Sequence, residues 1–153
     1  MNERFPLAYL FPLRIMSGLI LLIEGWGKLR GGWLHGTPLM GMLGGWLQEA
    51  KPYHFFLPVV STAHAHPKIF GMLVTAGELV VGASMFLGLA SRLGAFLGAA
   101  LLFSIAFASG QGLAPPGNAI LLGALMLLFV LAPPGRFLGL DSRLRVRLPR
   151  WMV

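Results

Sequence analysis

Residues 14–28, Arg14-Ile-Met-Ser-Gly-Leu-Ile-Leu-Leu-Ile-Glu-Gly-Trp-Gly-Lys28, constrain the architecture of the whole chain. The stretch is apolar enough for a membrane-crossing helix, yet it holds two cations and a carboxylate. A charged side chain near the bilayer centre costs roughly 2.5–3.5 kcal/mol on insertion scales. At about 100° per residue, Glu24 and Lys28 lie about 80° and 40° around the helix from Arg14. The three charges share one face, which we expect to point into protein or a hydrated cavity.

The composition of the chain is that of a membrane protein. Its 153 residues are 56% hydrophobic and 11% charged, whereas soluble domains are about 25% charged. One compact domain over residues 1–153 accounts for this length. The net charge of +7 comes from basic residues at the edges of apolar segments. This pattern sets membrane orientation and argues against nucleic-acid binding.

The chain has no cysteine. Thiol relays, iron–sulfur clusters, thiolate metal sites and disulfides are thereby excluded. A redox role would have to depend on a bound cofactor, a quinone or another subunit.

Four apolar segments predict an all-α integral membrane four-helix bundle, with spans at about residues 5–27, 69–89, 93–108 and 118–131. A long aromatic connection separates the first two spans. Within it, residues 39–47 are apolar but too short to cross a bilayer, which predicts an interfacial or re-entrant helix. This outer loop is either a ligand cap or a simple interfacial anchor. The arginine-rich tail, residues 136–153, and Arg92 predict that both termini are cytoplasmic.

Ionisable residues inside the predicted spans are candidates for both structure and chemistry. Glu78 lies in the middle of the second span, and we expect it to pair with Arg14 at mid-depth. Glu24 and Lys28 are spaced i, i+4 and form a second expected pair. These pairs either neutralise one another and fix helix register, or they act on a ligand. In the second case the carboxylates would exchange protons with a quinone headgroup, and Lys28 and Arg14 would stabilise anionic reduced forms.

Sites for metal, haem or flavin are not evident. His64-x-His66 lacks a third ligand for a metal ion. The predicted spans contain no histidine that could serve as an axial haem ligand.

Five short motifs occur in order along the chain. They are Arg14 with Gly18, Gly25-Trp-Gly-Lys28-Leu, Gly77-Glu78-Leu-Val-Val-Gly82, Leu87-Gly-Leu-Ala-Ser-Arg92 and Pro134-Gly-Arg-Phe-Leu-Gly-Leu-Asp141. In this order and placement they resemble the DoxX/DoxD family of small four-helix membrane proteins. The long aromatic loop after Lys28 is more similar to the DoxD branch than to the shorter DoxX proteins. The DoxD branch is the small membrane subunit of thiosulfate:quinone oxidoreductase.

The resemblance implies a plasma-membrane subunit that works with a DoxA-type partner. Such a complex passes electrons from thiosulfate to quinone and yields tetrathionate. On this chain the charged positions that the resemblance implies are Arg14, Lys28, Glu78 and Arg92, with Glu24 beside them. We expect Glu78 and Glu24 to be the catalytic carboxylates. The residues expected to bind substrate or quinone are Arg14, Lys28, Trp26, Trp33 and Arg92.

Two alternatives from other functional classes remain open. The first is a non-catalytic scaffold that assembles redox enzymes. The second is a carrier of small sulfur oxyanions lined by Arg14 and Lys28. The expected partners are the lipid bilayer together with a DoxA-type or other redox subunit, or further copies of the chain.

Overall fold

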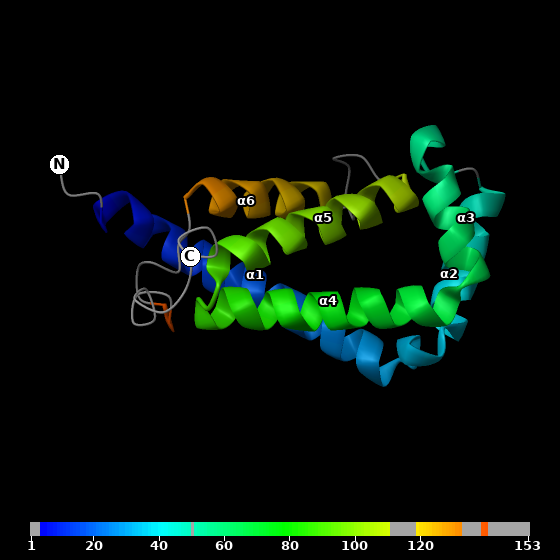
Figure 1. Ribbon diagram of the computed structural model, residues 1–153, viewed down its shortest axis with the longest axis horizontal. Helices are drawn as coiled ribbons and strands as arrows, with labels where there is room; N and C mark the ends of the chain where they lie inside the picture. The colour runs from blue at the N-terminus through cyan, green and yellow to red at the C-terminus, as the bar shows by residue number, and fades with distance from the viewer. Residues whose placement is uncertain (1–3, 50, 111–118, 133–138, 141–153) are drawn as a thin grey trace.

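The protein is helical throughout the part of the chain that its computed structural model describes. That part comprises residues 4–49, 51–110, 119–132 and 139–140, with the backbone alone for residues 4–9. The six α-helices are α1 (Arg4–Arg30), α2 (Thr37–Gln48), α3 (Leu57–Ala65), α4 (Pro67–Leu87), α5 (Ser91–Ser109) and α6 (Ala119–Leu131). Two short 3-10 helices, η1 (Trp33–His35) and η2 (His54–Phe56), lie in the connection between α1 and α4. Figure 1 shows the arrangement.

In the described part of the chain, three helices are long and apolar enough to cross a membrane, over Leu10–Arg30, Pro67–Leu87 and Ser91–Ser109. The fourth predicted span corresponds to α6, which is apolar and has 13 residues. That length is about 20 Å of helix, against about 30 Å for the hydrocarbon core. The expected all-α class is therefore found, and the count of four spans stays a prediction.

Close contact between glycines sets the antiparallel packing of α1 against α4. A methyl group added at Gly18 would lie 2.7 Å from the backbone nitrogen of Phe86. One added at Gly82 would lie 2.9 Å from the backbone nitrogen of Leu22. Side chains larger than hydrogen would push the two backbones apart, as at small-residue contacts between membrane helices. This contact therefore fixes the register, with Gly18 level with residues 82–86.

The α5–α6 pair packs on α4 near the α4–α5 turn and diverges from the α1–α4 pair toward the other end (Figure 1). A core of buried side chains fills the narrow half of this arrangement, including Met85, Ala95, Ala99, Met126 and Phe129. At Gly98 an added methyl group would lie 2.8 Å from a side-chain carbon of Val81. The two pairs thus form a V, with its vertex at the α4–α5 turn.

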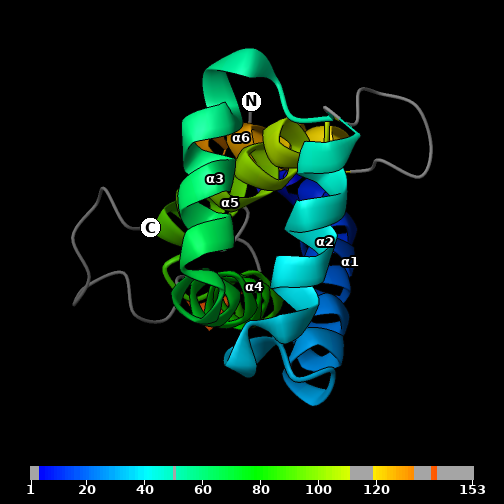
Figure 2. The same ribbon diagram turned by 90° about the vertical axis from the view of Figure 1, so that its right-hand side faces the viewer.

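Helices α2 and α3 form a hairpin across the wide end of the V, as Figure 2 shows. Their contact buries Leu39, Leu43, Val60 and Ala63 together with Ala108 of α5. The backbone N–H of Tyr53 donates to the carbonyl of Phe107, 3.1 Å away, which ties the hairpin to the end of α5. The short helix predicted over residues 39–47 is present as α2, whereas α3 was not expected. Placement of the hairpin at a membrane surface stays a prediction.

The predicted tail, residues 136–153, lies outside the described residues except for positions 139 and 140. Gly139 lies against the α4–α5 turn, with its Cα 2.8 Å from where a methyl group on Gly88 would be. This turn has two left-handed residues, Gly88 at φ 63° and Ala90 at φ 49°. Ser84 Oγ donates to the carbonyl of Leu89 at 2.7 Å and stabilises the turn.

Candidate functional site

A cavity of about 660 Å³ occupies the wide half of the V. All six helices contribute to its wall, and the α2–α3 hairpin closes one end of it. Most of the lining is aliphatic or aromatic, with Trp33, Trp46, Phe56 and Phe70 supplying rings. Three charged residues line it: Glu24, Lys28 and Glu78. The volume falls within the range of small-molecule sites, about 300–1,000 Å³.

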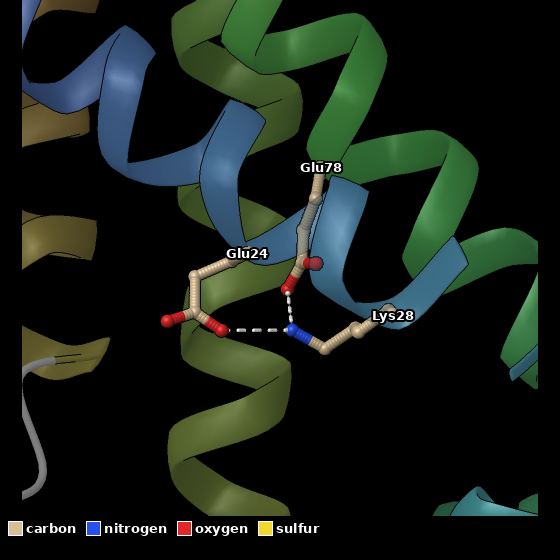
Figure 3. Close-up of polar contacts among 3 residues, drawn as sticks. All are labelled: Glu24, Lys28 and Glu78. Carbon is tan, nitrogen blue, oxygen red and sulfur yellow. Dashed lines mark hydrogen bonds and ion pairs between the residues drawn. The ribbon is translucent and has the colours of Figure 1, made fainter. Parts of the chain in front are cut away.

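The three charged residues form one cluster in which Lys28 lies between two carboxylates (Figure 3). Lys28 Nζ donates to Glu78 Oε1 at 2.8 Å, which links α1 to α4. The same Nζ is 3.4 Å from Glu24 Oε2, one turn earlier on α1. The predicted Glu24–Lys28 pair is therefore confirmed, and Lys28 is the cation that bridges the two helices.

Burial changes steeply across this cluster. The Glu78 side chain is 3% exposed, that of Lys28 is 16% exposed and that of Glu24 is 62% exposed. Lys28 Nζ also lies 5.3 Å from the centre of the Trp33 ring, a cation–π distance. Glu78 Oε2 is buried and has no hydrogen-bond partner among the described residues. A buried carboxylate oxygen without a donor is uncommon and indicates a place for a ligand atom or water.

The expected pairing of Arg14 with Glu78 is wrong. The Arg14 side chain is 1% exposed and lies against Gly88, ten residues from Glu78 along α4. Ten residues of helix span about 15 Å. The expectation placed the first span from residue 5 upward, but α1 runs past the α4–α5 turn (Figure 1). Arg14 therefore lies beside Gly88 in this turn.

Arg14 therefore does not line the cavity. Fourteen residues of helix, about 21 Å, separate it from Lys28. The predicted oxyanion carrier required both cations in one cavity, and the structure does not bring them together.

Two further predicted binding residues also lie away from the cavity. Trp26 is 51% exposed on α1, and Arg30 stacks on its ring at 5.1 Å. Arg92 lies in the first turn of α5, at the vertex of the V. Neither is among the lining residues. Trp33, by contrast, lines the cavity beside Lys28, as its predicted role requires.

Several lining residues were not singled out from the sequence. Phe56 and Val60 come from η2 and α3, and Ser104 comes from α5. Proline in the first turn of α3, at Pro58, is a signal that could have predicted this helix. For Ser104 the sequence has no signal, because serine is common in membrane helices and this hydroxyl donates to its own helix at Ala100.

Potential metal ligands do not gather anywhere in the described ranges, since no group of three or more His, Asp or Glu side chains is placed to hold an ion. His35, His54 and His66 are exposed, and His64 is half-buried beside Gly44.

The fold and the site together define a small helical membrane protein with a ligand-sized cavity and an ion-paired carboxylate in its wall. A model of the DoxX family matches residues 9–111, and the chain belongs to this family. The match covers most of α1 and all of α2 through α5, and so includes the whole charged cluster. No curated protein and no solved structure is similar enough to match the chain. The expected DoxX resemblance is confirmed, and its DoxD branch stays a prediction.

Proposed function

We propose that this DoxX protein is the quinone-binding membrane subunit of a redox complex, one that oxidises thiosulfate to tetrathionate. The observation that carries the proposal is Glu78, a buried ionisable side chain in the wall of a large apolar cavity within a membrane-spanning helix. Ionisable groups in such positions are expensive to keep and commonly mark proton or substrate pathways.

The lining of the cavity fits a quinone. A quinone joins a flat ring to an apolar chain, and the wall combines aromatic rings with aliphatic side chains around one charged cluster. The cavity also reaches the side of the bundle, because Ile20 and Leu73 line it and are 44% and 61% exposed. These residues are apolar, so a lipophilic molecule can enter from the bilayer.

When bound, the quinone supplies a two-electron acceptor. In the overall reaction, two thiosulfate ions give tetrathionate and two electrons, and the quinone takes up these electrons with two protons to become a quinol. Within this chain, the Glu78 carboxylate is assigned the proton exchange, and the exposed Glu24 connects the cluster to the surface through Lys28. The third N–H of Lys28 is available to donate to a ring oxygen.

Oxidation of thiosulfate is assigned to a partner subunit. The chain has no cysteine to form a covalent adduct with a sulfur compound. In this proposal the complex lies in the plasma membrane, with both termini of the chain on the cytoplasmic side. This orientation puts the vertex with Arg92 inside and the α2–α3 hairpin outside, in agreement with the basic tail.

The test uses the full chain purified in detergent together with its redox partner. Organic extraction and mass spectrometry should recover a bound quinone, and thiosulfate should drive quinone reduction. Glu78→Gln should lower the rate at least about a hundredfold, the lower end of the usual contribution of a proton-transferring group. Glu49→Gln is the matched control, because Glu49 is 61% exposed in a pair with Lys51 outside the cavity. Absence of quinone and an unchanged rate in Glu78→Gln would defeat the proposal.

A non-catalytic assembly role is the alternative, and one observation favours it. Glu24 is 62% exposed on a spanning helix although it contacts Lys28 at 3.4 Å, so a polar group of a partner protein can also reach its carboxylate. A scaffold would co-purify with its partner enzymes, would lose them on Glu24→Leu substitution and would show no redox turnover.

A further inference from the structure

The charged cluster contains an unsatisfied acceptor on a residue that lines the cavity. Glu78 Oε1 is occupied by Lys28 at 2.8 Å, whereas Glu78 Oε2 is buried without a partner. Desolvating a carboxylate oxygen without a hydrogen bond is unfavourable. A ligand that donates a hydrogen bond to Oε2 would relieve this cost, but a ligand that offers another acceptor there would not.

The charge of the lining also restricts the ligand. The described lining carries two carboxylates, Glu24 and Glu78, against one ammonium, Lys28. The guanidinium of Arg14 is too far away to compensate, since it lies beside Gly88 at the vertex. Interactions between charges are strong in an apolar environment. A doubly negative ion such as thiosulfate would therefore be repelled from this cavity.

We infer that the cavity selects an uncharged headgroup that bears hydroxyl donors and excludes sulfur oxyanions. This inference rests on the proposed quinone function, within which it means that the reduced dihydroxy ring binds more tightly than the oxidised dicarbonyl ring. Both forms accept a hydrogen bond from Lys28. The reduced form also donates a hydrogen bond to Glu78 Oε2, whereas the oxidised form leaves that oxygen unsatisfied.

The preference has a direct effect on the redox couple. A hydrogen bond to a charged group changes affinity by about tenfold or more. For a two-electron couple, each tenfold preference for the reduced form raises the midpoint potential of the bound quinone by about 30 mV. The site thereby makes the bound quinone a better electron acceptor. Thiosulfate itself must react outside this cavity, on the partner subunit.

The test compares binding of a short-chain quinone, the matching quinol and thiosulfate to the full chain in detergent under anaerobic conditions. Quenching of tryptophan fluorescence follows the two ring ligands, because Trp33 and Trp46 line the cavity. Equilibrium dialysis with labelled thiosulfate follows the anion. We expect quinol to bind at least about tenfold more tightly than quinone, and thiosulfate not to compete with either.

Two variants probe the reason for the preference. Glu78→Gln should bring the two affinities within about threefold, because an amide both donates and accepts hydrogen bonds. Glu24→Gln changes an exposed side chain, so it should fold normally and keep the preference for quinol while admitting thiosulfate at higher concentration. Glu49→Gln should retain both the preference and the exclusion.

The possible outcomes separate the inference from the proposed function. Quinone binding as tightly as quinol, or more tightly, would overturn the inference and leave quinone binding in place. It would mean that Oε2 carries a proton and acts as a donor. Thiosulfate binding that depends on Lys28 would also overturn the inference. If neither the quinone nor the quinol binds, both the proposed function and the inference are wrong. If Glu78→Gln does not fold, the affinities of the unmodified chain and of Glu24→Gln for quinol and quinone still test the inferred preference for quinol.

Discussion

Replacing Lys28 by methionine would leave the Glu78 carboxylate buried without its ammonium partner. The two side chains are 16% and 3% exposed and 2.8 Å apart, so the pair is largely removed from solvent. Breaking such a pair from one side costs about 3–5 kcal/mol, because an uncompensated charge stays buried. Since Lys28 retains some exposure, we expect a loss near the lower end, about 3 kcal/mol in the free energy of unfolding.

The contact between Glu24 and Lys28 should contribute much less to the free energy of unfolding. Glu24 is 62% exposed and 3.4 Å from Lys28, so Glu24→Gln should cost about 0.5 kcal/mol or less once solvent screening is included. Lys51→Met is the matched control for Lys28→Met. Lys51 pairs with Glu49, and both side chains are about half exposed, so its loss should also cost no more than about 0.5 kcal/mol.

A double-mutant cycle isolates the pair itself. In Lys28→Met combined with Glu78→Met, two apolar side chains of similar size replace both charges, and most of the stability should return. We expect a coupling energy of about 2 kcal/mol or more, within the range for residues in direct contact. Unfolding is measured by titrating SDS into detergent micelles while following helical circular dichroism. A coupling below about 0.5 kcal/mol, or costs that simply add, would show that this ion pair does not hold α1 against α4.

Three further changes test other parts of the structure. Gly18→Ala should destabilise the bundle by about 1–3 kcal/mol through backbone overlap, whereas Gly27→Ala, with nothing within 4 Å of the added methyl group, should be neutral or stabilising in the same titration. Arg14→Met should lower stability by removing a buried guanidinium at the vertex, yet leave the affinity for quinol unchanged. A tenfold loss of quinol affinity in Arg14→Met would show that Arg14 takes part in binding. Trp33→Leu should weaken quinol binding severalfold, since this ring lines the cavity beside the ammonium. Trp26→Leu, on the exposed face, should leave the affinity as it is.

The helices could be predicted because apolar runs separated by glycine and proline mark their limits. The predicted span over residues 69–89 is observed as Pro67–Leu87, and that over residues 93–108 as Ser91–Ser109. The small shifts arise at the ends, where Pro67 begins α4 and Gly88 ends it. Hydrophobic pattern determines which segments are helical, but it does not determine how the helices align.

The error over Arg14 shows where that limit lies. A first span that begins at residue 5 puts Arg14 at mid-depth, whereas the register of α1 against α4 is set by contact at Gly18, Gly25 and Gly82. Matching these glycines across an antiparallel pair would have placed Lys28 within reach of Glu78 and moved Arg14 to the turn. The sequence therefore predicts the helix face on which the charges lie. To identify Lys28, and not Arg14, as the partner of Glu78 requires the register of α1 against α4.

The cavity could not be predicted in the same way. It exists because α5 and α6 diverge from α1 and α4, and because α2 and α3 cover the open end (Figures 1 and 2). Such angles between helices depend on many side-chain contacts at once, including the buried core near Met85 and Phe129. Neither composition nor spacing along the sequence reports them.

In the V-shaped arrangement, a small rotation about the α4–α5 turn moves the far ends of the helices by a large distance. Helices of about 20 residues are about 30 Å long, so a rotation of 10° at the turn moves their far ends by about 5 Å. That displacement is comparable to the thickness of an aromatic ring with its contacts. The α2–α3 hairpin, which bridges the far ends, therefore limits how wide the cavity between the helix pairs can become.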